Sequence, residues 1–284
     1  MSMLRLALCN EVLQPRGFAD QCRIAAQLGY DALEVAPFTL ADDPMTLSDA
    51  QARSYAQMAT DAGIGISGLH WLLVAPAGLS IVADDAALRR RTVDVMKRMV
   101  ELCALMGGHY LVHGSPKQRS VPAGCSQAQA LERATACWAD AAHHAASAGG
   151  VYCIEPLSTR ETDLVNTVEQ AVQVVQAVNM AALRTMIDCS AAGQVESEPV
   201  EALLRRWLPT GTIAHIQIND PNRRAAGMGV MKFAPILEAI LDMQQGGHYS
   251  GWLASEPFDY VPDGMAAAAY TAGYLKGLLE ARHP

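Results

Sequence analysis

The sequence predicts an α/β protein, a (β/α)8 TIM barrel with eight parallel strands, as a single domain over residues 1–284. A short apolar run, a polar tip and a longer segment with helical spacing recur throughout the chain. The intervening segments are long enough for the helical crossovers that parallel strands need. The doubly wound nucleotide-binding alternative is disfavoured, because the turn at residues 9–15 contains no GxGxxG motif.

The predicted strands are short and largely apolar, as strands buried on both faces should be. In chain order they cover residues 4–9, 32–36, 64–69, 110–113, 151–155, 183–188, 213–218 and 252–256. The clearest helix is predicted at residues 86–106, where apolar side chains recur every three to four positions and two glycines follow. Further helices are predicted at residues 18–28, 49–62, 127–148, 167–178, 200–207, 233–242 and 266–281.

Composition and charge restrict the classes of partner. Lys and Arg total 21 against 29 Asp and Glu, a formal charge of -8, which argues against nucleic acid or an anionic membrane. The seven cysteines show no CxxC pair, and we expect buried free thiols. With no signal-peptide core or membrane-spanning run, we expect a cytoplasmic enzyme for a small molecule. Apolar positions on the helices suggest a homodimer or homotetramer.

Four predicted strands in succession end in a side chain that offers oxygen. These residues are Glu155, Asp188, Gln217 and Glu256. The C-terminal ends of barrel strands converge on one mouth, so the four could surround one point. A lone acid after a strand commonly caps a helix or forms a salt bridge, but the joint placement favours a site. Three carboxylates and an amide oxygen suit one Mg²⁺ or Mn²⁺ better than Zn²⁺.

Two segments carry a family resemblance. Residues 215–229 read HIQINDPNRRAAGMG, and residues 155–162 read EPLSTRET. They resemble the xylose-isomerase-like barrel superfamily of sugar isomerases and epimerases, in particular hydroxypyruvate isomerases and ketose 3-epimerases. The resemblance implies one divalent metal, Mn²⁺ or Mg²⁺ with Co²⁺ as an alternative. It places Glu155, Asp188, Gln217 and Glu256 on the metal-ligand positions, and Glu161 and Arg223 on positions that hold substrate hydroxyls.

At positions 215 and 191 the roles of the residues do not follow directly from the resemblance. Counting back six residues from Arg223 reaches Gln217, so His215 is expected to be a neighbour of the ligands, with metal or substrate contact as the alternative. Relatives usually carry a substrate-contacting His three residues after the strand-six Asp, where this chain has Ala191. The identity of the sugar or keto-acid substrate therefore does not transfer from any relative.

The predicted chemistry moves a proton on carbon next to a carbonyl. Glu155 and Glu256 would act as acid and base on opposite faces of the substrate, through a cis-enediolate stabilised by the metal. Reprotonation of the same carbon gives an epimerase, and of the neighbouring carbon an aldose–ketose isomerase. Expulsion of a β-hydroxyl would instead give a dehydratase or lyase. A catalytically silent barrel that serves as a binding subunit is a further alternative.

Other strand-end residues are weaker candidates for substrate contact. His70 and Trp71 follow strand three and could supply a hydrogen bond and an apolar wall for a sugar. Lys117 lies in a basic loop after strand four and could hold a carboxylate or phosphate. The segment Gly227-Met-Gly229 is interpreted as a flexible loop that lets Arg223 approach the ligand.

Overall fold

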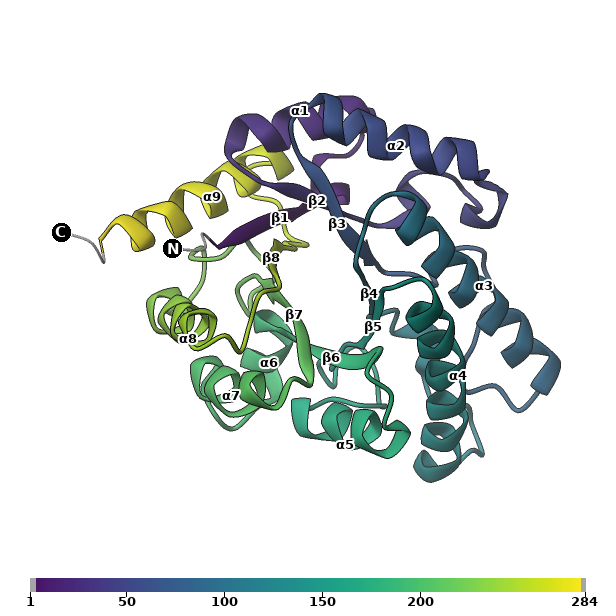
Figure 1. Ribbon diagram of the computed structural model, residues 1–284. Coiled ribbons are helices and arrows are strands. Elements are labelled where there is room, and N and C mark those ends of the chain that lie inside the picture. The colour runs from purple at the N-terminus through teal and green to yellow at the C-terminus, as the bar shows by residue number, and fades with distance from the viewer. Residues whose placement is uncertain (1–3, 282–284) are drawn as a thin grey trace.

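The computed structural model describes residues 4–281, and its strands close into an eight-stranded parallel barrel (Figure 1). Each strand pairs with its neighbours in sequence, and β1 pairs with β8 to complete the ring. The strands are β1 Arg5–Cys9, β2 Ala32–Val35, β3 Gly65–His70, β4 Tyr110–His113, β5 Val151–Ile154, β6 Leu183–Asp188, β7 Ile213–Ile218 and β8 Trp252–Ser255. The predicted (β/α)8 fold is confirmed, and every predicted strand agrees to within one residue at either end.

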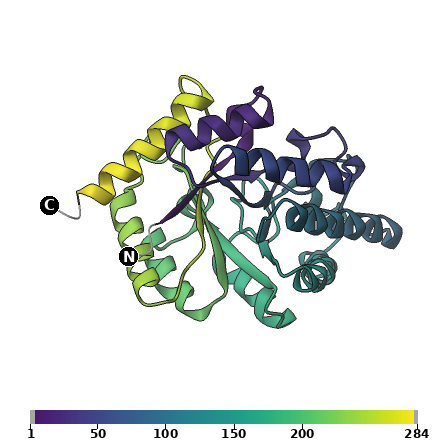
Figure 2. The ribbon, with the colours of Figure 1, turned by 45° about the horizontal axis from the view of Figure 1, so that its top comes forward.

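Helices form the outer ring around the strands (Figures 1 and 2). They are α1 Phe18–Leu28, α2 Asp49–Asp61, α3 Ala86–Leu105, α4 Gln127–Ser147, α5 Val168–Val178, α6 Cys189–Val195, α7 Val200–Trp207, α8 Phe233–Gln245 and α9 Gly264–Glu280. Short 3-10 helices occur at η1 Asn10–Leu13, η2 Pro37–Thr39, η3 Pro44–Thr46, η4 Lys117–Arg119 and η5 Leu208–Thr210. Helix α6 was not predicted, because its short sequence, CSAAGQV, has no apolar periodicity.

The strand residues are buried on both faces, which explains their apolar composition. One face packs on the helices, and the other fills the interior of the barrel. Two large apolar clusters result, one mainly from the elements between β1 and β5 and one mainly from those after it. The cysteines are free thiols, and all but the half-buried Cys125 are buried, as expected.

Polar side chains interrupt this apolar interior at its C-terminal end. The buried polar residues include Glu11, Glu34, His70, Glu155, Asp188, His215, Gln217 and Glu256. Burial of so many ionisable groups is costly unless they are paired or bind a cation. Within residues 4–281, no helix is both long and apolar enough to cross a membrane.

Candidate metal site

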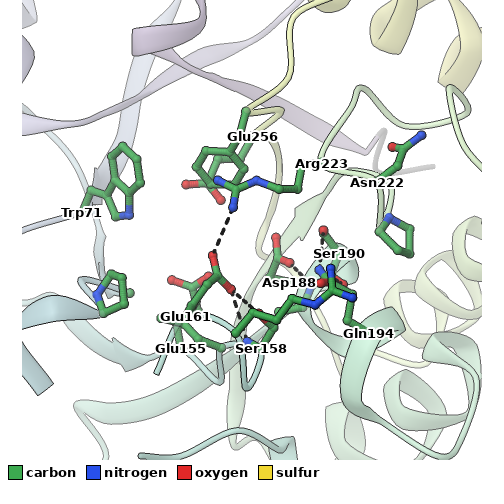
Figure 3. Close-up of a pocket in the computed structure, with 17 residues that line it drawn as sticks. Trp71, Glu155, Ser158, Glu161, Asp188, Ser190, Gln194, Asn222, Arg223 and Glu256 are labelled. Carbon is green, nitrogen blue, oxygen red and sulfur yellow. Dashed lines mark hydrogen bonds and ion pairs between the residues drawn. The ribbon is translucent and has the colours of Figure 1, made fainter. Parts of the chain in front are cut away.

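Three carboxylates predicted as ligands converge at the mouth of the barrel. Glu155 follows β5, Asp188 ends β6 and Glu256 follows β8, and one oxygen from each lies within 4.8 Å of the others. All three side chains are buried, with at most 6% of any residue exposed. Figure 3 shows them pointing into the same space. Three of the four residues predicted as ligands thus lie close together, and their binding of a metal stays a prediction.

Local structure fixes how Asp188 is presented. Asp188 is the N-cap of α6, and its Oδ1 accepts a hydrogen bond from the backbone N–H of Ala191. Its Oδ2 is buried and has no hydrogen-bond partner among the residues described. One oxygen is thus committed to the helix, and the other is available to a ligand.

The position of Glu155 depends on the strand beside it. Gly114 follows β4, and a Cβ built there would lie 1.8 Å from Oε2 of Glu155. Any larger residue at position 114 would therefore displace this carboxylate from its observed position. The fully buried Arg119 donates from Nη1 to the backbone oxygen of Glu155 at 2.7 Å. The loop after β4 thus supports Glu155 from two sides.

The pKa values of all three carboxyl groups are raised, and burial is the largest cause in each case. Burial, followed by the charges of Glu256 and Asp188, holds the pKa of Glu155 well above its usual range. Burial raises the pKa of Asp188 to about 7. Burial raises the pKa of Glu256 to about 8, although hydrogen bonding to His70 opposes the shift. Crowded acids with raised pKa values are typical of a site that holds a cation or transfers protons.

Gln217 lies on β7 in register with Asp188 on β6. Its side chain is fully buried, and Nε2 donates to Oε1 of Glu34 at 2.7 Å. Its own Oε1 is buried and lacks a hydrogen-bond partner within residues 4–281. A buried amide oxygen without a donor is unusual, and it suits a ligand position.

His215 lies in the barrel interior and does not line the pocket. Its ring stacks on Tyr110 with centroids 4.1 Å apart, and Nε2 lies 2.8 Å from Oε2 of Glu34. Burial opposes a charge on Glu34, but His215 and His70 outweigh it and lower the pKa of Glu34 to about 2. His215 thus contacts Tyr110 and Glu34, and its predicted place beside the metal ligands stays a prediction.

His70 lies behind Glu256, where its ring is fixed between two carboxylates. Nδ1 lies 2.8 Å from Oε1 of Glu256, and Nε2 lies 3.0 Å from Oε2 of Glu11. The charge of Glu11 and these hydrogen bonds outweigh burial and raise the pKa of His70. His70, which was predicted to contact the substrate, thus contacts Glu256 and is not among the residues that line the cavity described below.

Glu155, Asp188 and Glu256 line a cavity of about 210 Å³. Trp71 and Phe258 form an apolar wall, with ring centroids 5.5 Å apart. The guanidinium of Arg223 lies 4.6 Å above the Phe258 ring and 3.9 Å from Oε1 of Glu161, the ion pair drawn as a dashed line in Figure 3. Trp71 and Arg223 have φ of 52° and 68°, a left-handed conformation that is rare for such side chains and gathers at functional sites.

Two loop predictions remain, for Lys117 and for the segment Gly227–Gly229. Lys117 is exposed and is not among the residues that line the cavity, whereas Arg119 in the same loop is buried beneath Glu155. The segment from Gly227 to Gly229 was predicted to be a flexible loop, and in the structure hydrogen bonds hold its backbone. The Asp220 carboxylate accepts hydrogen bonds from the backbone of Gly227, Gly229 and Met231 at 2.9–3.0 Å.

Sequence reasoning missed the residues that support the site from behind. Glu34, Gly114, Arg119 and Asn219 were not singled out, although Asn219 donates to the backbone oxygen of Glu256 at 2.8 Å. A usable signal existed for Glu34, since an acid inside an apolar buried strand calls for a partner. Nothing in a single sequence identifies the glycine that must face Glu155.

The fold, with acids gathered at the ends of its strands, is that of a parallel (β/α)8 barrel with a candidate metal site. The chain belongs to the family described as "Xylose isomerase-like TIM barrel", whose sequence profile matches residues 22–278. It is similar to the D-psicose 3-epimerase of Ruminiclostridium cellulolyticum, at 25% identity over 82% of this chain and 75% of the relative. A D-psicose 3-epimerase of Enterocloster bolteae is 23% identical over 81% and 73% of the two chains. The structure also resembles that of an L-ribulose 3-epimerase, with a TM-score of 0.83, 20% identity, and coverage of 98% and 95%.

Proposed function

We propose that the protein is a divalent-metal-dependent epimerase or isomerase of small ketoses, and that it acts as a 3-epimerase. The observation that carries the proposal is the convergence of Glu155, Asp188 and Glu256 within 4.8 Å in a buried pocket. The similarity to two D-psicose 3-epimerases supports a ketose as the substrate.

The residues present fit a hard divalent cation. Three buried carboxylates repel one another, and a cation would neutralise most of that charge. Oδ2 of Asp188 and Oε1 of Gln217 are buried oxygens that find no donor in the described part of the chain. The oxygen-only donor set of Glu155, Asp188, Gln217 and Glu256 suits Mn²⁺ or Mg²⁺, with Co²⁺ as an alternative. When bound, the cation would supply electrophilic stabilisation to the substrate oxygens.

The residues of the pocket would have separate roles in proton transfer, exclusion of water and substrate binding. Glu155 and Glu256 come from strands on different sides of the mouth, and each would exchange one proton with the substrate carbon. Trp71 and Phe258 exclude water from one side of the pocket. Arg223 and Glu161 would hold substrate hydroxyls, and Ser158 fixes Glu161 by donating to its Oε2 at 2.7 Å.

The test is solvent exchange at the reacting carbon. Purified protein with Mn²⁺ is incubated in D₂O with D-psicose, D-fructose or L-ribulose, and deuterium at C3 is followed by NMR. We expect exchange by the wild type and none by Glu155→Gln or Glu256→Gln, each with an unchanged circular dichroism spectrum. Undiminished exchange in both variants would reject the assignment, and a deoxy keto product would identify a dehydratase instead.

A further inference from the structure

We propose that Glu34 is a positioning residue for metal binding: it holds the Gln217 amide by its NH₂ group and so turns Oε1 toward the metal. This inference deepens the proposed function and rests on it. Glu34 lies on β2 and Gln217 on β7, so the contact crosses the barrel interior. Both side chains are fully buried.

The contacts of the Glu34 carboxylate determine which end of the Gln217 amide it binds. Tyr110 donates its hydroxyl to Oε2, and Nε2 of His215 lies 2.8 Å from the same oxygen. Oε1 accepts from Nε2 of Gln217 at 2.7 Å. An acceptor group in this position binds the NH₂ of an amide and not its oxygen. Gln217 therefore cannot turn over without losing this hydrogen bond.

Oε1 of Gln217, which Glu34 leaves without a partner among the described residues, belongs to a residue of β7, beside the strand that ends in Asp188. Gln217 is the register partner of Asp188, whose Oδ2 is likewise buried without a partner in the described chain. A buried amide oxygen without a hydrogen-bond donor costs folding free energy, unless a bound ligand such as a cation contacts it. Groups behind the ligands of a metal site orient them in this manner, and their loss weakens metal affinity about 10- to 100-fold.

The test measures Mn²⁺ affinity directly, by the electron paramagnetic resonance signal of the free ion. We expect Gln217→Ala to weaken binding about 10- to 100-fold and Glu34→Gln to weaken it by a similar factor. Because Glu34 acts through Gln217, the variant with both changes should bind Mn²⁺ no more weakly than Gln217→Ala alone. The inference would be overturned if the double variant lost as much Mn²⁺ affinity as the two single variants combined, or if Glu34→Gln bound Mn²⁺ like the wild type.

Two further variants separate positioning from packing and charge. Tyr110→Phe removes a donor to Glu34 but keeps the Gln217 contact, so its Mn²⁺ affinity should stay near that of the wild type even if the protein is less stable. The exchange Glu34→Gln with Gln217→Glu keeps both the net charge and the hydrogen bond, and it should restore Mn²⁺ affinity if Glu34→Gln folds poorly or binds weakly. Failure of this exchange to bind Mn²⁺ better than Gln217→Ala contradicts the inference. If the wild type itself binds no Mn²⁺, Mg²⁺ or Co²⁺, the proposed function fails instead.

Discussion

Nδ1 of His70 lies 2.8 Å from Oε1 of Glu256, and the opposite nitrogen of the ring lies 3.0 Å from Oε2 of Glu11. Both ring nitrogens of His70 are thus hydrogen-bonded, and the ring fixes the rotamer of Glu256, which is proposed to transfer a proton. All three side chains are buried. Small displacements of such a group have large kinetic consequences, because reacting atoms must be aligned closely.

His70→Ala is therefore expected to slow deuterium exchange about 100-fold. Imidazole added to the solution should restore part of the activity, which a merely structural role would not produce. His113→Ala is the matched control, since that buried ring bonds the Tyr152 hydroxyl at 2.8 Å. An equal loss in both variants, without rescue of His70→Ala by imidazole, would refute the positioning role.

The metal-free protein should lose stability as the pH rises. In the folded state the pKa of Asp188 is raised to about 7 and that of Glu256 to about 8. The unfolded chain titrates at lower, ordinary values, so the folded state holds more protons between the two ranges. The unfolding free energy then falls as the pH rises toward and through the folded pKa values.

Urea unfolding in EDTA between pH 5 and pH 9 measures this trend. Glu256→Gln should flatten the slope because it removes one of the titrating groups. Saturating Mn²⁺ should also flatten it, since a cation favours the ionised carboxylates. Stability that increases over this pH range in EDTA would show that the carboxylates are not protonated as expected.

Gly114→Ala should disturb the site without unfolding the barrel. The new Cβ would lie 1.8 Å from Oε2 of Glu155, so the carboxylate must move. We expect deuterium exchange to fall about 100-fold, as for a displacement of about 1 Å. Gly17→Ala is the control, because a Cβ there has open space. Mn²⁺ titration and thermal unfolding of both variants complete the comparison, and wild-type exchange in Gly114→Ala would contradict the steric argument.

Arg223→Ala should weaken substrate binding more than turnover. The guanidinium lines the cavity beside Phe258 and Glu161, two residues with no proposed role in proton transfer. We expect KM to rise about 10-fold, equivalent to about 1.4 kcal/mol, with a smaller change in kcat. Arg224→Ala is the neighbouring control, since Arg224 pairs with the half-exposed Asp259 at 2.8 Å. Equal effects in steady-state assays of the two variants would remove Arg223 from the substrate site.

The sequence predicted the strands and the strand-end acids because both follow local rules. Apolar runs of strand length locate β1 to β8, and the topology then brings Glu155, Asp188 and Glu256 to one mouth. The partners of those residues could not be predicted in the same way. Glu34 meets Gln217 across the barrel, and the two are 183 positions apart in sequence. Such contacts depend on side-chain reach and rotamers, which periodicity does not encode.

The Asp220 carboxylate ties three backbone N–H groups of the segment that follows Arg223. These hydrogen bonds would hold this segment in one shape before the proposed ketose binds. Little conformational entropy then remains to be lost on association, so discrimination between epimeric ketoses would depend on static complementarity. Screening of sugars against a rigid template is a reasonable route to the natural substrate.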